Sequence, residues 1–174
     1  MSETADNAEA PSGADRVLIV EDDEPVAAMF SRALERAGFE TEVVSSVEAA
    51  LESMGRLLPD FLSLDIALPG RSGLDLLRVI KRDKLLAKIP VVIVTGHAGD
   101  AQGEGGLRDF VRDPHKSGPV ILLEKPVEPS VYVNAISRTL AVEKTQEHEP
   151  RPTLLKQIED VLIDATPNAV RHVD

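Results

Sequence analysis

The chain has 174 residues, no cysteine and a formal net charge of −11. The lack of cysteine excludes a disulfide framework, cysteine-ligated zinc and thiol catalysis. The acidic balance argues against a nucleic acid or an anionic membrane as the default partner. The sequence has no apolar run long enough to cross a bilayer, and its first residues do not form a signal peptide. We therefore expect a cytoplasmic protein with one domain and flanking tails.

Residues 1–15 are small, polar and acidic without an apolar period, which predicts a disordered arm. After this arm, strand-like apolar runs alternate with helical patterns in five pairs. The first run is RVLIV, and the helix that follows it is expected from Glu24 to Ala37, ending at Gly38. The later pairs are FETEVV with Val47 to Met54, DFLSLD with Leu74 to Ile80, PVVIVT with a weak segment at Leu107 to Arg112, and PVILLE with Val131 to Leu140.

Continuous apolar runs indicate strands that are covered on both faces. The sequence therefore predicts an α/β fold, a doubly wound five-stranded parallel sheet with helices on both faces. Right-handed crossovers place the carboxyl ends of all strands on one edge, where such sheets bind ligands. The polar residues at these ends are Glu21, Asp22 and Asp23 after the first strand, Asp65 after the third, Thr95 on the fourth and Lys125 after the fifth. Such a set predicts an oxygen-rich site for Mg²⁺ beside a phosphoryl group.

Four motifs stand in order at these strand ends: VEDD, LDIALPGRSG, VTG and EKP. Each is weak alone, but together they resemble the receiver domain of bacterial two-component response regulators over about Arg16 to Leu140. The resemblance implies a flavodoxin-like sheet with strand order 2-1-3-4-5. It also implies a stand-alone regulator whose receiver domain occupies residues 16–142.

The resemblance assigns the phosphoacceptor role to Asp65, which would receive a phosphoryl group from a histidine kinase or phosphotransfer protein. Asp22, Asp65 and the backbone carbonyl of Ala67 would ligate Mg²⁺, with Glu21 acting through a bound water. Asp23 is interpreted as the cap of the following helix, because a carboxylate there stabilises the first turn.

The remaining site residues lie on the last two strands. By resemblance, Thr95 would donate its hydroxyl to one phosphoryl oxygen and Lys125 would pair with another. Pro126 is expected to follow a cis peptide bond that turns Lys125 inward. Taken singly, these residues also fit a helix start, a plain turn or a solvated charge, so the assignment depends on their joint arrangement.

Two features depart from the family pattern. Leu122 stands three positions before the lysine, where family members often carry a Tyr or Phe that moves on activation. The segment Gly96 to Gly118 is long and rich in glycine, which disfavours helix, so we expect a short or displaced fourth helix and a switch located there. His97 is interpreted as a solvent-facing loop residue, the alternative being a side chain over the phosphorylation site.

The C-terminal part predicts a linker at 143–152, an amphipathic helix at 153–166 and a tail at 167–174. This helix is too short to bind DNA as a domain, and it could pack on its own domain, dimerise or dock on a partner.

The predicted function is a single-domain response regulator that signals by protein contact, without nucleic acid or membrane, and is a possible homodimer. Its chemistry would be limited to Mg²⁺-dependent phosphorylation and dephosphorylation of itself. One alternative is a pseudo-receiver, an interaction scaffold without a phosphorylation switch. Another is a phosphohydrolase of the haloacid dehalogenase type, which requires a second Asp where this chain has Ala67.

Overall fold

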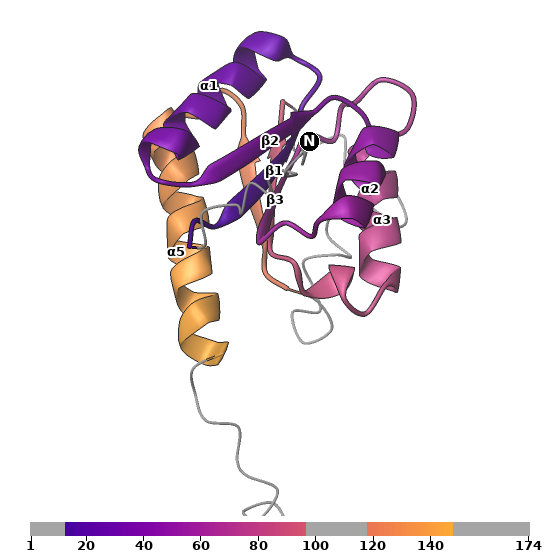
Figure 1. The fold of residues 1–174 in the computed structure, drawn as a ribbon. Coiled ribbons are helices and arrows are strands. Elements are labelled where there is room, and N and C mark those ends of the chain that lie inside the picture. Colours follow the sequence, from indigo (N-terminus) through magenta and orange to yellow (C-terminus); the bar gives the residue numbers. More distant parts are fainter. Residues whose placement is uncertain (1–12, 97–117, 148–174) are drawn as a thin grey trace, which may run out of the picture. The chain divides into compact units, whose positions relative to one another are not determined.

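The computed structural model describes residues 13–96 and 118–147 (Figure 1). The chain divides into one compact unit of residues 1–140 and a second of residues 141–174. The predictions for residues 1–12, for His97 and most of the glycine-rich segment, and for 153–174 lie outside the described residues.

Five parallel strands form one sheet in the order β2-β1-β3-β4-β5. This order and the parallel pairing confirm the predicted doubly wound α/β fold. The strands are β1 (Arg16–Val20), β2 (Glu40–Val44), β3 (Phe61–Leu64), β4 (Val91–Thr95) and β5 (Val120–Glu124).

The helices begin at residues that cap their first turn. Asp23, Ser46 and Ser72 each accept a hydrogen bond from a backbone N–H of the helix that follows. Ser72 forms a reciprocal capping box with Asp75, which fixes the turn that leads away from β3. The helices are α1 (Glu24–Arg36), α2 (Val47–Arg56), α3 (Gly73–Arg82), the 3-10 turn η1 (Leu86–Lys88) and α5 (Pro129–Glu147).

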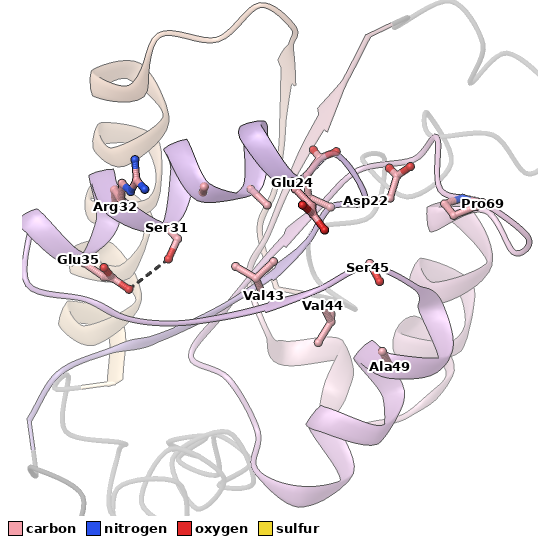
Figure 2. A pocket seen from close by; sticks show the side chains of 13 residues that line it. Asp22, Glu24, Ser31, Arg32, Glu35, Val43, Val44, Ser45, Ala49 and Pro69 are labelled. Atoms are coloured by element: carbon pink, nitrogen blue, oxygen red, sulfur yellow. Dashed lines mark hydrogen bonds between the residues drawn. The ribbon is translucent and has the colours of Figure 1, made fainter.

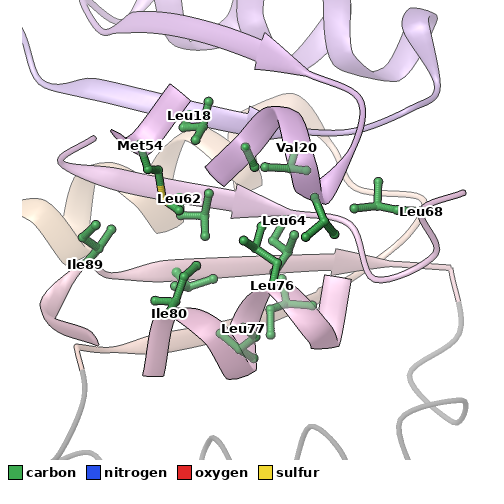
Figure 3. Close-up of a cluster of buried hydrophobic side chains, with 14 residues drawn as sticks. Leu18, Val20, Met54, Leu62, Leu64, Leu68, Leu76, Leu77, Ile80 and Ile89 are labelled. Atoms are coloured by element: carbon green, nitrogen blue, oxygen red, sulfur yellow. The ribbon is translucent and has the colours of Figure 1, made fainter. Parts of the chain in front are cut away.

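Helices α1 and α5 cover one face of the sheet, and α2 and α3 cover the other (Figure 1). Alternate residues of a strand enter different cores: Val17 and Ile19 pack toward α1 and α5, whereas Leu18 and Val20 pack toward α2 and α3. Figure 3 shows the second core, in which Leu76 and Ile80 of α3 pack on the sheet. Burial on both faces fixes the strand register and thereby the position of each strand end.

Helix α5 is longer than the predicted segment Val131 to Leu140, since it continues to Glu147. Most of the residues from Ala141 to Glu147 are good helix formers, and the first proline after them is Pro150. The beginning of the predicted linker at 143–152 is therefore helical. Among the described residues, no helix combines the length and apolar character needed to span a membrane.

Candidate functional site

The carboxyl ends of the strands bring the predicted site residues together. Backbone hydrogen bonds continue the β1–β3 pairing beyond the strands, because the amide of Asp65 donates to the carbonyl of Val20 at 3.0 Å. Glu21 and Asp65 thus follow adjacent strands. The side chains of both residues are buried, as is Thr95 at the end of β4, whereas Asp22 is exposed. At the carboxyl ends of the strands, the carboxylates of Glu21 and Asp65 are therefore buried, and the carboxylate of Asp22 is exposed to solvent.

Lys125 joins the two buried carboxylates. Its Nζ lies 2.8 Å from Oε2 of Glu21 and 3.2 Å from Oδ2 of Asp65. The backbone supports this position, because the amide of Lys125 donates to the carbonyl of Thr95 at 2.8 Å. The bond between Lys125 and Pro126 is cis, as predicted. A single ammonium group thus compensates two carboxylates that come from residues at least 60 positions away in the sequence.

The pKa values of Glu21 and Lys125 are set by two opposing effects, burial and the interactions between the charged groups. Burial raises the pKa of Glu21, and the nearby charge of Asp65 raises it further, while the hydrogen bond from Lys125 offsets part of this effect. Burial acts to lower the pKa of Lys125, but the hydrogen bond to Glu21 and the charge of Asp65 outweigh it and raise the pKa. The lysine is consequently held as a cation, and the site carries more negative charge than the lysine neutralises.

The loop after β3 holds the carboxylate of Asp65 from the other side. Oδ1 of Asp65 accepts a hydrogen bond from the backbone amide of Ala67 at 3.0 Å, which leaves Oδ2 toward Lys125. The loop then returns so closely that a Cβ on Gly73 would lie 2.2 Å from the carbonyl oxygen of Asp65. Only glycine fits there without displacing the backbone of Asp65.

Carboxylate oxygens of Glu21, Asp22 and Asp65 lie within 4.8 Å of one another, as a cation site requires. Three hard oxygen donors at this spacing, two of them buried, fit a divalent ion such as Mg²⁺. Asp23 does not belong to the cluster. Its carboxylate accepts a hydrogen bond from the amide of Val26 at 3.1 Å, which confirms its interpretation as a helix cap.

An open groove of about 990 Å³ leads away from the acidic end of the sheet. It lies between α1, the edge strand β2 and the start of α2 (Figure 2). Asp22 and Pro69 lie at one end of the groove, and Arg32 and Glu35 lie at the other. The exposed carboxylate of Asp22 is therefore reached from solvent along this groove.

Some features of the site were not anticipated. The pairing of Lys125 with Glu21 was missed, because the resemblance assigned the lysine to a phosphoryl oxygen. The role of Gly73 was also missed, although a glycine directly after the capping residue Ser72 is a signal for close backbone approach. Leu122 is 41% exposed on β5, so it does not pack under the site in this structure.

The strand order and the strand-end acids, hydroxyl and lysine define a doubly wound α/β domain of the receiver class. Residues 17–137 match the model of the response regulator receiver domain. The chain therefore belongs to this family. It also resembles solved receiver domain structures described as CheY-like. That of Methanospirillum hungatei has a TM-score of 0.63 and 25% identity, covering 77% of this chain and 99% of that one.

Curated relatives include the DNA-binding response regulator MtrA of Mycolicibacterium smegmatis. It is 30% identical over 155 residues, which cover 89% of this chain and 61% of MtrA. The phosphate regulon transcriptional regulatory protein PhoB of Pseudomonas aeruginosa is 34% identical over 115 residues, covering 64% of this chain and 50% of PhoB. The chain thus spans about three fifths of the first relative's length and half of the second.

Proposed function

We propose that this chain is a phosphoacceptor of a two-component system, with Asp65 as the residue that receives the phosphoryl group. The observation that carries the proposal is the contact of Lys125 with both Asp65 and Glu21, which concentrates a cation beside a buried carboxylate. Family membership supports a histidine kinase or phosphotransfer protein as the donor.

In the proposed transfer, an oxygen of Asp65 forms a bond to phosphorus while the bond from phosphorus to the donor nitrogen breaks. The electron pair of that bond stays with the donor, and the product on this chain is an acyl phosphate. Lys125 pairs with one phosphoryl oxygen and the hydroxyl of Thr95 donates to another, so that the added charge is neutralised.

The acids present fit a bound Mg²⁺, which would supply further neutralisation of the phosphoryl oxygens. We propose that Asp22, Asp65 and the backbone carbonyl of Ala67 hold the ion, with Glu21 acting through a water molecule. The spacing of the carboxylates of Glu21, Asp22 and Asp65 supports this set.

We propose that the signal leaves by protein contact. MtrA is described as DNA-binding, but the net charge of −11 on this chain opposes direct contact with a phosphate backbone. As domain organisation we propose a receiver domain at 16–142 and a linker at 143–152, of which the first residues continue helix α5 to Glu147. An amphipathic helix at 153–166 would then lead to the tail at 167–174. The simplest partner for that helix is a second copy of this chain, which would make the protein a homodimer.

The test is uptake of a phosphoryl group from a small phosphodonor such as acetyl phosphate, with and without Mg²⁺. We expect the intact mass to increase by one phosphoryl group only when Mg²⁺ is present. Reduction of the acyl phosphate with borohydride and peptide mapping should then locate the modification at Asp65. No uptake, with the fold intact, would favour the scaffold alternative. Steady release of phosphate from other phosphate esters would favour a phosphohydrolase.

A second expected result separates the neighbouring acids Asp22 and Asp23. Asp22→Ala removes a proposed ligand, so Mg²⁺ affinity should fall by about tenfold or more. Asp23→Ala removes the cap of α1 and should cost about 1 kcal/mol of stability with little change in affinity. Titration with Mg²⁺ and urea unfolding of both variants check this. Equal losses of affinity would contradict the assignment of the two roles.

A further inference from the structure

Tyr132 of α5 carries a buried hydroxyl that is not used by the site as described above. The side chain is 0% exposed, and its ring stacks on Phe30 of α1 with ring centroids 4.0 Å apart and planes at 20°. Within the part of the chain that the structure describes, the hydroxyl oxygen has no hydrogen-bond partner. A buried hydroxyl without a partner is unfavourable, and phenylalanine would fill the same space without this cost.

The hydroxyl lies on the face of the sheet that carries the acidic site. Helices α1 and α5, which hold the stacked rings, cover this face together (Figure 1). Ile19 pairs with Ser63 in the β1–β3 register, and Glu21 and Asp65 follow two residues later on the same face. Burial raises the pKa of Tyr132, the neighbouring hydroxyl of Ser63 lowers it in part although it does not meet the geometry of a hydrogen bond, and the negative charge of Glu21 raises it slightly. The hydroxyl therefore stays protonated as a hydrogen-bond donor, and the charge of Glu21 acts on it from the same face of the sheet.

Phosphorylation, on which this inference depends, changes what Glu21 is bonded to. In the present structure Lys125 lies closer to Glu21, at 2.8 Å, than to Asp65, at 3.2 Å. A phosphoryl group on Asp65 adds nearly two negative charges and draws the ammonium group of Lys125 toward its oxygens. Glu21 is only 4% exposed, so apart from the water proposed between Glu21 and Mg²⁺, bulk solvent does not readily replace the lost hydrogen bond.

We propose that Tyr132 is a positioning residue whose hydroxyl donates to the carboxylate of Glu21 once Lys125 has moved to the phosphoryl group. The phosphorylated form then gains a charge-assisted hydrogen bond that the unphosphorylated form lacks. The residue lies on α5, so the state of the site is transmitted to this helix without an aromatic residue at Leu122.

Tyr132→Phe tests the proposal, because it removes the hydroxyl and keeps the ring stacked on Phe30. Beryllofluoride with Mg²⁺ serves as the probe, since it mimics a phosphoryl group on a carboxylate. We expect Tyr132→Phe to bind beryllofluoride about tenfold more weakly than the wild type, as the loss of one hydrogen bond to a charged group predicts. Its melting temperature without the probe should equal or exceed that of the wild type.

Phe30→Leu is the matched control, because it disturbs the same aromatic pair without touching the hydroxyl. This variant should melt at a lower temperature but bind beryllofluoride with the affinity of the wild type. Wild-type affinity in Tyr132→Phe, or an equal loss in both variants, would overturn the proposal. If the wild type itself fails to bind the probe, the proposed phosphoacceptor function is wrong, and this inference falls with it.

Discussion

Asp65→Asn is expected to take up no detectable phosphoryl group under conditions in which the wild type is fully phosphorylated. The amide has nearly the shape of the carboxylate but lacks the anionic oxygen that attacks phosphorus. The fold should survive, because Glu21 still pairs with Lys125 and the charge of Asp65 that raises the pKa of Glu21 is gone. Intact mass after incubation with acetyl phosphate and Mg²⁺ measures the uptake.

A matched control comes from Asp83, which is exposed at the C-terminal end of α3. Asp83→Asn makes the same chemical change away from the strand ends, and its amide oxygen can still accept from the backbone amides of Leu85 and Leu86. This variant should be phosphorylated like the wild type. Uptake by Asp65→Asn at the wild-type level would assign the acceptor to another residue.

The fold was predictable because its determinants are local. Continuous apolar strands and helices with a regular apolar period define a parallel sheet with two helical layers, and both cores formed as that pattern requires. The predicted ends of the helices and strands were less accurate, since they depend on capping residues. Helix α5 passes its predicted end at Leu140 because no proline or glycine stops it before Glu147.

The sequence predicted which residues gather at the site, but it did not predict the individual contacts that each of them makes. One strand end offers Glu21, Asp22 and Asp23 in succession, and sequence alone assigns their roles only through the resemblance. In the structure the three acids differ: Glu21 points inward to Lys125, Asp22 is exposed, and Asp23 caps α1. Such contacts depend on side-chain directions at the end of a twisted sheet, which periodicity does not encode.

The relation between Ser63 and Tyr132 was not predictable either. In the sequence, Ser63 is one residue of an apolar strand and Tyr132 one residue of an amphipathic helix, and nothing marks either of them. The significance of the hydroxyl of Tyr132 arises from long-range packing, which buries it on the face of the sheet that also carries Glu21 and Asp65. A buried polar atom without a partner is identified only when all neighbouring elements are in place.

Lys125→Met should destabilise the protein by about 2–3 kcal/mol at pH 7 without Mg²⁺, below the range for fully buried pairs because the lysine is 25% exposed. The change removes the ammonium group that contacts Glu21 and Asp65 and leaves two buried carboxylates facing each other. Urea unfolding in the presence of a chelator measures the loss. Added Mg²⁺ should restore much of it, since the ion supplies the missing positive charge.

The loss should depend on pH in a defined direction. The pKa of Glu21 is already raised in the folded protein, so above its usual value of 4.5 the folded state binds more protons than the unfolded state. Stability therefore rises as the pH falls toward 4.5. Without Lys125, the hydrogen bond that lowers the pKa of Glu21 is absent, so the pKa rises further and this window extends toward neutrality. The deficit of Lys125→Met should accordingly be smaller at pH 5 than at pH 7.

Lys84→Met is the control for this experiment, because Lys84 is exposed in the turn after α3. Its stability should remain within about 0.5 kcal/mol of the wild type at both pH values. A deficit of Lys125→Met that is the same at pH 5 and pH 7 would mean that lost packing of the lysine stem, rather than uncompensated charge, causes the destabilisation. A deficit that shrinks on acidification and on addition of Mg²⁺ would show that one cation at this position holds the acidic edge of the sheet together.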